Sequence, residues 1–391
     1  MDRQPPRDDA AASQTRAHER WMRRCIDLAQ YGAGHASPNP MVGSVIVGPT
    51  GQVLGEGYHE RYGGLHAERN AIRDALTRHP GEALAEATLY VNLEPCNHHG
   101  KTPPCTDIVL EYSIPRVVVG MVDPFEQVAG KGLDRLRAHG VEVTVGVLEA
   151  ACQRLNEGFT HHIRTRRPLV TLKVAQTLDG RIATRTSDSQ WVTGHAARQR
   201  VHQWRSELDG VLVGAGTASA DDPALTVRHV TGRQPQRFVL DRTGRLAPNL
   251  QLFTDAHAAY TTAFVGPDVE PEYAAALGEA GGRIHHLPLD ADGHLNLHAL
   301  LDWLGAHGGI DGRPLQSLLV EAGPGLATAL WRADFVDRYA CFVAPKLIGT
   351  GKPAVGDLDL VKMTNALTFA DARWETVRDD LLFFGYRRPT V

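Results

Sequence analysis

The chain has 391 residues, of which 42% are hydrophobic and 22% are charged, so a disordered or fibrous protein is excluded. Its length predicts two or three domains. The 41 lysines and arginines are outnumbered by 45 acidic residues, and the net charge of -4 argues against general binding of DNA or RNA. The polar start lacks the apolar core of a secretion signal, and no later apolar run has the length of a membrane span. We therefore expect a soluble cytoplasmic protein.

The first half of the chain alternates helical and strand-like patterns. Residues 1–18 are polar without periodicity and are predicted to form a flexible tail. The elements expected after this tail are a helix over 21–29, strands over 42–47 and 52–58, a helix over 65–78, a strand over 88–93, a helix opened by Pro103 and Pro104, a strand over 116–120, a helix over 131–139, a strand over 141–147 and a helix over 149–163. This alternation predicts a three-layer α/β domain over residues 19–163.

A second domain is predicted over residues 168–391, because the charged segment 164–168 ends in proline and precedes a new β-rich run. Residues 266–282 fit a loop with or without one helix. The elements expected elsewhere are a strand over 169–175, a helix over 196–207, strands over 210–213, 237–241 and 259–265, a helix over 298–306, a strand over 318–321 and a β-rich end. The second half is therefore also α/β, without a sequence repeat of the first.

Three residues of the types that can bind zinc stand at the predicted starts or ends of helices and strands. His66 opens a helix, Cys96 follows a strand and Cys105 opens the next helix. Zinc accepts one imidazole and two thiolates, and a catalytic site keeps its fourth position for water. Glu68, two residues after His66, can move protons without binding the metal. A His-x-Glu sequence with a later Pro-Cys pair is a known signature of zinc deaminases, so this pattern predicts one.

An isolated histidine or cysteine is usually a capping or packing residue and not a metal ligand. We therefore interpret the cysteines outside the ligand pattern as packing residues: Cys25, Cys152 and Cys341. The insert between the two ligand cysteines, residues 97–104, is longer than the two residues that many deaminases have. It brings a histidine and a lysine beside the metal site. A lysine there would suit a phosphate on the substrate.

Two glycine-rich turns follow predicted strands in the second half. Neither is a Gly-x-Gly-x-x-Gly dinucleotide fingerprint. The run 213–217 fits a cofactor turn and a plain strand-to-helix turn equally well. The run 321–327 leaves a strand and enters a helix, where free N–H groups and the helix dipole attract a phosphate, so here we favour anion binding.

The motifs resemble those of the bifunctional riboflavin-biosynthesis deaminase/reductases of the RibD type. The resemblance covers nearly all of the chain after the tail. It rests on the segments 38–43, 66–68, 93–105, 127–132, 172–181, 189–193, 220–228 and 320–324. The long cysteine insert is specific to this branch of the deaminases. The sequence departs from the family pattern at Phe125 and Glu126, where the family usually has Asn-Pro. It also departs at Gln176 and Arg242, which replace a small residue and often a serine.

For the first domain, the resemblance implies a cytidine-deaminase-like fold. The implied reaction is hydrolytic removal of an exocyclic amine from a pyrimidinone that carries a ribosylamino 5'-phosphate. His66, Cys96 and Cys105 would bind zinc, and Glu68 would be the proton donor. The implied substrate-binding residues are Asn39, His98, Lys101 and Asp123.

For the second domain, the resemblance implies a dihydrofolate-reductase-like fold that uses NADPH to reduce the ribosyl group to a ribityl chain. The implied cofactor-binding residues are Gln176, Trp191, Thr217, Asp221, Arg242, Gly323, Pro324, Gly325, Leu326, Ala327, Thr328 and Ala329. The implied substrate-binding residues are Ser189, Arg205, Leu225, Arg228 and Glu321. Arginines can hold a phosphate by forked hydrogen bonds, while Glu321 and Ser189 can address sugar hydroxyls. Lys173 and Asp179 are equal candidates for the proton donor or for surface ion pairs.

Two alternatives stay open at this point. The second half could be a non-catalytic binding or dimerisation module attached to a deaminase. The first half could instead be a zinc-stabilised module that edits or binds nucleic acid, which the acidic balance and the long cysteine insert disfavour. The resemblance also implies a homo-oligomer, either a dimer or a tetramer.

Overall fold

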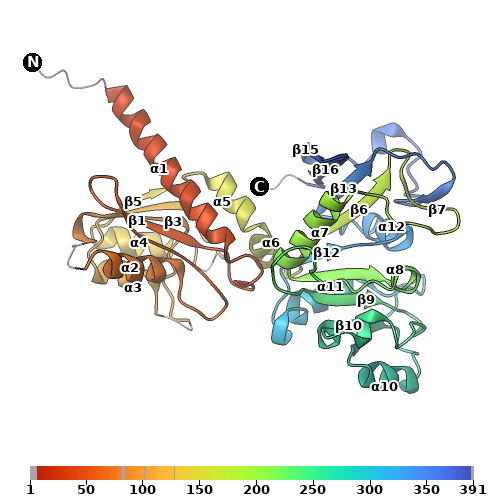
Figure 1. Ribbon diagram of the computed structural model, residues 1–391. Helices are drawn as coiled ribbons and strands as arrows, with labels where there is room; N and C mark the ends of the chain where they lie inside the picture. The colour runs from red at the N-terminus through yellow and green to blue at the C-terminus, as the bar shows by residue number, and fades with distance from the viewer. Residues whose placement is uncertain (1–6, 81–83, 101–102, 127, 389–391) are drawn as a thin grey trace, which may run out of the picture. The chain divides into compact units, whose positions relative to one another are not determined.

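The computed structural model describes residues 7–80, 84–100, 103–126 and 128–388 (Figure 1). The chain divides into two compact units, Met1–Thr165 and Arg166–Val391. Within the described residues, no helix combines the length and the apolar character needed to span a bilayer.

The first unit is built on a five-stranded sheet with the strand order β2-β1-β3-β4-β5. β1 pairs antiparallel with β2 and β3, whereas β3, β4 and β5 are parallel. The strands are β1 (Gly43–Val47), β2 (Val53–Tyr58), β3 (Thr88–Leu93), β4 (Arg116–Met121) and β5 (Glu142–Val145). The helices are α1 (Arg7–Gln30), α2 (Ala67–Arg78), α3 (Cys105–Glu111), α4 (Lys131–Ala138), α5 (Glu149–Leu155) and α6 (Glu157–Thr165), with a 3-10 turn at Leu84–Glu86.

Alternation along each strand sends neighbouring side chains to opposite faces of this sheet. Ile46 packs with buried residues of α2, α3 and α4, whereas Val45 and Val47 pack with residues of α1 and α5. Figure 1 shows the same arrangement, with α1 and α5 on one side of the strands and α2, α3 and α4 on the other. The sheet is therefore the middle of three layers, as the sequence predicts.

Two helices of this unit differ from their predicted bounds. α1 begins at Arg7, inside the segment predicted to be a tail, and this start includes the helix-forming run Ala10–Ala12. The predicted helix over 149–163 is interrupted at Asn156. The Asn156 amide binds both backbone polar groups of Met41, at 2.8 and 3.0 Å, which holds it outside helical geometry.

The second unit contains a nine-stranded sheet with the order β11-β10-β9-β8-β12-β6-β13-β16-β15. The strands from β11 to β13 in this order are parallel, and β16 pairs antiparallel with β13 and β15. The strands are β6 (Leu169–Thr177), β8 (Gly210–Gly214), β9 (Gln236–Leu240), β10 (Thr261–Val265), β11 (Arg283–His286), β12 (Ser317–Val320), β13 (Arg338–Ala344), β15 (Ala370–Val377) and β16 (Asp380–Tyr386), with β7 (Arg181–Thr184) and β14 (Gly351–Pro353) in a separate pair.

Helices cover both faces of this sheet. The helices are α7 (His195–Glu207), α8 (Ala215–Asp221), α9 (Gln251–Thr254), α10 (Pro271–Glu279), α11 (Leu297–His307) and α12 (Pro324–Arg332), with 3-10 turns at Ala258–Tyr260, Ile310–Gly312 and Met363–Asn365. Buried residues of α11 and α12 pack on one face, and those of α7 to α10 pack on the other. The unassigned segment 266–282 contains α10, and the short strands β7, β11 and β14 were not predicted from the sequence.

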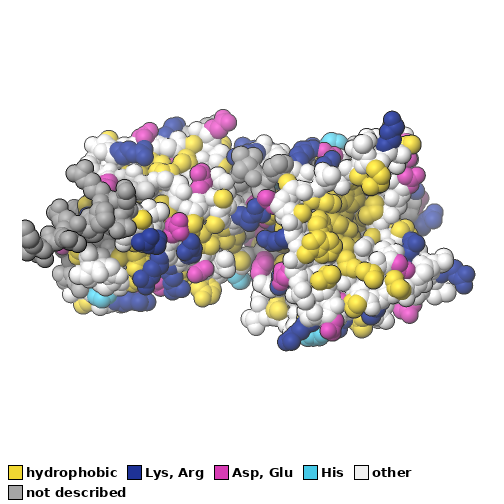
Figure 2. Space-filling view, turned by 90° about the horizontal axis from the view of Figure 1, so that it is seen from above, with side chains coloured by type: hydrophobic (Ala, Val, Ile, Leu, Met, Phe, Trp, Pro, Cys, Tyr) yellow, Lys and Arg dark blue, Asp and Glu magenta, His cyan; other side chains and the backbone are white. Residues whose placement is uncertain are grey.

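Hydrophobic side chains also gather on one face of the second unit (Figure 2). β15 is the edge strand of the large sheet, and Trp374 on β15 is 63% exposed. Leu381 on β16 is 45% exposed. An apolar patch at a sheet edge is a feature of surfaces that contact other chains.

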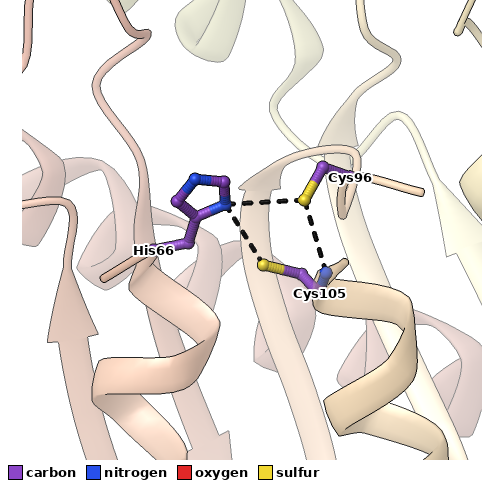
Figure 3. Close-up of side chains that lie close together, drawn as sticks. All are labelled: His66, Cys96 and Cys105. Carbon is purple, nitrogen blue, oxygen red and sulfur yellow. Dashed lines mark hydrogen bonds between the residues drawn. The ribbon is translucent and has the colours of Figure 1, made fainter. Parts of the chain in front are cut away.

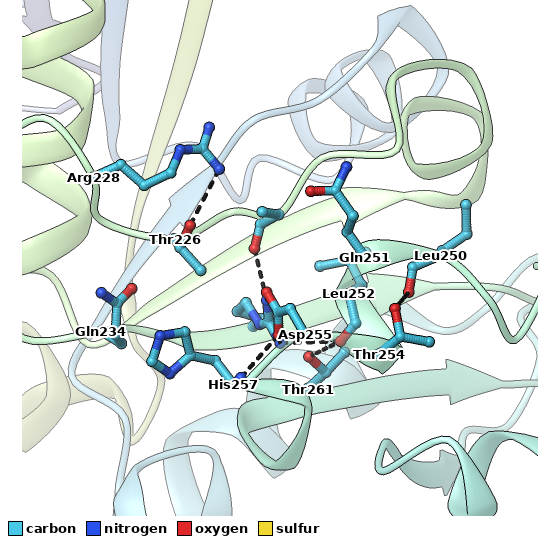
Figure 4. Close-up of polar contacts among 12 residues, drawn as sticks. Thr226, Arg228, Gln234, Leu250, Gln251, Leu252, Thr254, Asp255, His257 and Thr261 are labelled. Atoms are coloured by element: carbon cyan, nitrogen blue, oxygen red, sulfur yellow. Dashed lines mark hydrogen bonds and ion pairs between the residues drawn. The ribbon is translucent and has the colours of Figure 1, made fainter.

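The second unit contains a buried ion pair that ties several segments together (Figure 4). The side chain of Arg237 on β9 is 1% exposed and donates to both carboxylate oxygens of Asp255, at 2.7 and 2.8 Å. The same guanidinium donates to the carbonyls of Ala224 and Leu252, at 2.7 and 3.0 Å. It therefore joins β9 to α9 and to the loop after α8.

Replacing Asp255 by alanine should lower the free energy of unfolding by about 3–5 kcal/mol, because the Arg237 guanidinium stays buried without a counter-ion. Urea unfolding followed by tryptophan fluorescence measures this, since five of the six tryptophans lie in the second unit. The control is Glu375→Ala, which breaks the exposed pair with Arg200 and should cost at most about 1 kcal/mol. Equal losses of unfolding free energy in Asp255→Ala and Glu375→Ala would contradict the role of Asp255 as the counter-ion of a buried guanidinium.

Candidate active sites

His66, Cys96 and Cys105 converge in the first unit (Figure 3). His66 is the N-cap of α2, Cys96 follows β3, and Cys105 is the first residue of α3. His66 Nδ1 lies 3.5 Å from Cys96 Sγ and 3.3 Å from Cys105 Sγ, and the ligand atoms all lie within 4.8 Å of one another. Among the described residues, these three form the one group of histidine, cysteine or acidic side chains with metal-binding geometry.

The donor set fits zinc. The Cys105 backbone N–H, at the start of α3, donates to Cys96 Sγ at 3.3 Å. The hydrogen bond from the Cys105 thiol, stronger than the opposing effect of burial, lowers the pKa of Cys96. One thiol is therefore ready to bind a metal as thiolate, which is the form that zinc requires. The three donors leave a fourth tetrahedral position open.

Glu68 lies in the first turn of α2 and is only 3% exposed. Burial raises the pKa of this carboxyl group, and the nearby Cys96 raises it further. A carboxyl group with a raised pKa exchanges protons more readily near neutral pH than an exposed one. Glu68 thus has the environment of a general acid and base beside the metal ligands.

Asn39, which is predicted to bind the deaminase substrate, is connected to this centre through His59. Asn39 Nδ2 lies 3.0 Å from His59 Nε2, and the other ring nitrogen of His59 lies 3.0 Å from the carbonyl of Leu65. The His59 ring stands edge-on to His66, with centroids 5.4 Å apart. His59 is not predicted from the sequence, because a single histidine after a strand carries no signal of its own. Asn39 is thereby held beside the metal ligands.

Asp123 follows β4 and accepts a hydrogen bond from the Phe125 backbone at 2.9 Å. Burial raises the pKa of Asp123, and His98 opposes this rise electrostatically. The Phe125 backbone therefore takes part in the turn that shapes this side of the site, whatever its side chain does. The predicted substrate residue Lys101 lies outside the described residues.

Glu94 supports the same turn at Asp123. It is another residue of this site that is not predicted from the sequence. Its carboxylate, 6% exposed, accepts from the backbone N–H groups of Asp123, Gly130 and Gly132 at 3.2, 2.9 and 2.9 Å. It therefore links the end of β3 to the loop after β4 and to the start of α4.

In the second unit, four neighbouring parallel strands, β9, β8, β12 and β6, bring predicted site residues to one edge of the sheet. Gln176 lies near the end of β6, Thr217 follows β8, Arg242 follows β9 and Glu321 follows β12. Ligands in α/β sheets bind outside the carboxyl ends of the strands. Within the described part of the chain, the side chains of Gln176 and Arg242 form no hydrogen bond to another predicted site residue.

The two glycine-rich turns meet at this edge. A Cβ atom added to Gly323 would lie 3.4 Å from Thr217 Oγ1, so the turns after β8 and β12 are in contact. Gly323 is the N-cap of α12, and Pro324 is its first residue. The free N–H groups of this first helical turn fit a phosphate group of a nucleotide cofactor such as NADPH.

Glu321, at the end of β12, is held by two cations. Its carboxylate accepts from Arg205 Nε at 2.6 Å and lies 3.6 Å from Lys173 Nζ. Burial alone would raise the pKa of Glu321, but Arg205 and Lys173 outweigh it and lower the pKa to about 2. Glu321 is therefore a carboxylate at neutral pH and accepts hydrogen bonds only.

The two predicted phosphate-binding arginines occupy different environments. Arg205 is 8% exposed and also donates from Nη1 to the Thr226 carbonyl at 3.1 Å. Arg228 is exposed, and its Nη1 donates to Thr226 Oγ1 at 3.2 Å. Partial desolvation of the guanidinium and the nearby Arg205 lower the pKa of Arg228. Arg205 is thus committed to internal partners, whereas Arg228 has donors to offer a ligand.

Three further predicted residues of this unit, Ser189, Trp191 and Leu225, lie on loops, and Asp221 is the last residue of α8. Trp191 is 61% exposed, with the Arg198 guanidinium 4.4 Å from its ring centroid, and Lys346 Nζ donates to its carbonyl at 2.6 Å. Burial raises the pKa of Asp221, to which the Ser189 side chain is hydrogen-bonded. Leu225 is 2% exposed and has a positive φ of 52°.

The structure separates the two candidates for the proton donor. Asp179 accepts from Thr177 Oγ1 at 2.5 Å and from the Gly349 backbone at 2.7 Å, so it stabilises a turn. Lys173 instead faces Glu321. The cysteines predicted to pack in the core are confirmed as buried: Cys25, Cys152 and Cys341.

The folds and the two sites define the class of the protein as a zinc-type deaminase joined to a reductase. Residues 15–121 match the family model described as "Cytidine and deoxycytidylate deaminase zinc-binding region". Residues 168–383 match the one described as "RibD C-terminal domain". The chain belongs to the RibD family of bifunctional deaminase/reductases of riboflavin biosynthesis. The predicted zinc-dependent deaminase and NADPH-dependent reductase are thereby confirmed, and a merely structural second half is not supported.

Individual relatives agree with this assignment over almost their whole length. The riboflavin biosynthesis protein RibD of Actinobacillus pleuropneumoniae is 40% identical over 93% of both chains. The RibD protein of Synechocystis is 41% identical over 93% of this chain and 95% of its own. A solved structure of Acinetobacter baumannii RibD is 34% identical and superimposes with a TM-score of 0.83, covering 95% of this chain and 99% of that chain.

A solved structure from Thermotoga maritima is 35% identical, has a TM-score of 0.81 and covers the same shares of the two chains, 95% and 99%. That protein is described as a diaminohydroxyphosphoribosylaminopyrimidine deaminase and 5-amino-6-(5-phosphoribosylamino)uracil reductase.

The ion pairs of Glu321 make the stability of the second unit depend on pH. A carboxylate whose pKa falls from about 4.3 in the unfolded chain to about 2 in the folded one contributes about 3 kcal/mol. This contribution is complete above the unfolded pKa and is lost as the pH falls toward 2. Glu321→Gln should therefore lower the free energy of unfolding by about 3 kcal/mol at pH 7, and the difference from wild type should shrink below about pH 4.

Urea unfolding at a series of pH values tests this prediction. Asp302→Asn is the control, because Asp302 belongs to a pair with Arg167 in which its side chain is 61% exposed. A loss in Glu321→Gln that stays constant from pH 7 to pH 3 would show that the ion pairs do not hold this carboxylate.

Proposed function

We propose that the first site deaminates 2,5-diamino-6-ribosylamino-pyrimidinone 5'-phosphate and that the second site reduces the ribosyl group of the product to ribityl. The similar protein from Thermotoga maritima is described as a deaminase and reductase of such compounds. The observation that carries the proposal is that one chain contains both the His66, Cys96 and Cys105 group with the buried Glu68 and the strand-end carboxylate Glu321 beside two glycine turns.

In the first site, His66, Cys96 and Cys105 are the residues that would hold zinc. Zinc, when bound there, supplies Lewis-acid activation of a water molecule. Glu68 takes a proton from that water and delivers protons to the ring nitrogen and the leaving amine. The amine departs as ammonia, and the water oxygen becomes the new carbonyl oxygen. Asn39, fixed by His59, is placed to hold the pyrimidine ring.

In the second site, the turns at Thr217 and Gly323 would hold NADPH, which supplies the hydride. The carboxylate of Glu321 accepts hydrogen bonds from the sugar hydroxyls and so orients the carbon that receives the hydride. Lys173, 3.6 Å from Glu321, is the better-placed proton donor of the two candidates. The exposed guanidinium of Arg228 binds the substrate phosphate by charge-assisted hydrogen bonds.

The homo-oligomer and the cytoplasmic location stay predictions. The exposed apolar side chains on β15 and β16 give physical support to contact with a second copy (Figure 2).

Glu68→Gln tests the proposed division of labour. We expect its rate of ammonia release to fall by about 10²–10⁴-fold, because the amide cannot carry protons. Its oxidation of NADPH with the deaminated intermediate should stay at the wild-type rate. The measurement incubates zinc-replete protein with the diaminopyrimidinone phosphate, or with the deaminated compound and NADPH, and follows ammonia and the nicotinamide absorbance.

The matched control is Glu60→Gln, which changes an exposed glutamate of the same unit and should leave both rates unchanged. If Glu68→Gln released ammonia at the wild-type rate, Glu68 would have no role in the deamination. Ammonia release without any NADPH oxidation by the wild type would contradict the proposed reduction.

A further inference from the structure

The loop that carries Arg228 is held by side chains instead of by a neighbouring strand. This loop runs between α8 and β9, and Figure 4 shows part of it around Thr226 and Arg228. Two buried arginines donate to its carbonyls: Arg237 Nη1 to Ala224 at 2.7 Å and Arg205 Nη1 to Thr226 at 3.1 Å. Arg237 and Arg205, which also form the ion pairs with Asp255 and Glu321, therefore anchor the first half of the loop.

Gln234 binds both backbone polar groups of the next loop residue, Val227. Its Oε1 accepts from the Val227 N–H at 2.8 Å, and its Nε2 donates to the Val227 carbonyl at 3.1 Å. The amide side chain thus replaces the pair of hydrogen bonds that a neighbouring strand would give. Val227 itself is 7% exposed, so its backbone groups need these partners.

His202 anchors the backbone of Arg228 itself. It lies on α7, one helical turn before Arg205, and is 5% exposed. Its Nδ1 accepts a hydrogen bond from the Arg228 N–H at 3.1 Å. An imidazole can accept at Nδ1 only when it is neutral and carries its proton on Nε2.

The charges around His202 favour that neutral form. Burial, Arg205, His229 and Arg228 all lower the pKa of His202, against Glu321, which raises it, and the result is a pKa of about 4. The His229 ring stands edge-on to it with centroids 4.4 Å apart. The ring is thus an uncharged acceptor at neutral pH, where a third cation would repel both arginines.

We propose that His202 is a positioning residue for the reductase: its Nδ1 fixes the backbone of Arg228 and thereby aims the Arg228 guanidinium at the phosphate of the substrate. This inference rests on the proposed function, in which Arg228 binds that phosphate. The Arg228 side chain has Thr226 Oγ1 as a hydrogen-bond partner, at 3.2 Å. Its direction consequently depends on how firmly the backbone of residues 226–228 is held.

The test compares substitutions that keep or remove an acceptor at the Nδ1 position. His202→Phe keeps a ring but has no acceptor, and His202→Gln moves the amide one atom further from the backbone. His202→Asn places an amide oxygen close to where Nδ1 lies. With full-length protein and NADPH, we expect the phenylalanine and glutamine variants to raise KM for the deaminated phosphorylated substrate about tenfold.

Other kinetic constants should separate this role from general damage. In the phenylalanine and glutamine variants, kcat, KM for NADPH and the rate of ammonia release should stay within about twofold of wild type. His202→Asn should keep KM for the phosphorylated substrate within about threefold. With the same substrate lacking its phosphate, all three variants and the wild type should have equal KM values.

Two results would overturn the inference: an equal rise of KM for the substrates with and without phosphate, or a failure of asparagine to restore the wild-type KM. Arg228→Gln distinguishes this outcome from failure of the proposed function. If Arg228→Gln loses the preference for the phosphorylated substrate while His202→Phe keeps it, His202 alone is misassigned. If Arg228→Gln also keeps the preference, Arg228 does not bind the phosphate and the proposed function needs revision.

Discussion

The carboxyl ends of parallel strands meet at one edge of a sheet, and the site residues of both units depend on this constraint. In the first unit, Cys96 follows β3 and Asp123 follows the adjacent parallel strand β4. In the second unit, the residues after β8, β12 and β9 include Thr217, Glu321 and Arg242. The helices that return from these edges begin at the sites, so Cys105 and Gly323 both stand at helix N-termini. The N–H of Cys105 donates to Cys96 Sγ.

The first site contains the buried Glu68 and the second the partly buried Glu321, and their surroundings shift the pKa values of the two carboxyl groups in opposite directions. Burial and the nearby Cys96 raise the pKa of Glu68, so it is suited to moving protons. Glu321 contacts Arg205 and Lys173, so its pKa is lowered to about 2 and it remains an acceptor of hydrogen bonds. The same side chain type thus has a raised pKa in one unit and a lowered pKa in the other, because only Glu321 contacts two cations strong enough to outweigh burial.

The sequence predicted the metal ligands because their chemistry is local: His66 and Glu68 are two residues apart, and the cysteines stand at element ends that periodicity can locate. It predicted most of the large-sheet strands for the same reason. It could not predict β7 and β14, which are short and pair with each other across a long stretch of chain. His59, Glu94 and His202 were missed because their partners, such as the Arg228 N–H, are brought close only by the tertiary fold. The unequal environments of Arg205 and Arg228 likewise depend on burial, which residue type does not reveal.

We infer that two separate chemistries occupy the two units of one chain and that only the deaminase needs the metal. The most direct measurement removes zinc with a chelator and follows both reactions against the remaining zinc content. We predict that ammonia release falls in proportion to zinc and returns when zinc is added. Oxidation of NADPH with the already deaminated substrate should keep its full rate throughout. Loss of both activities in parallel with zinc would contradict the separation of the sites.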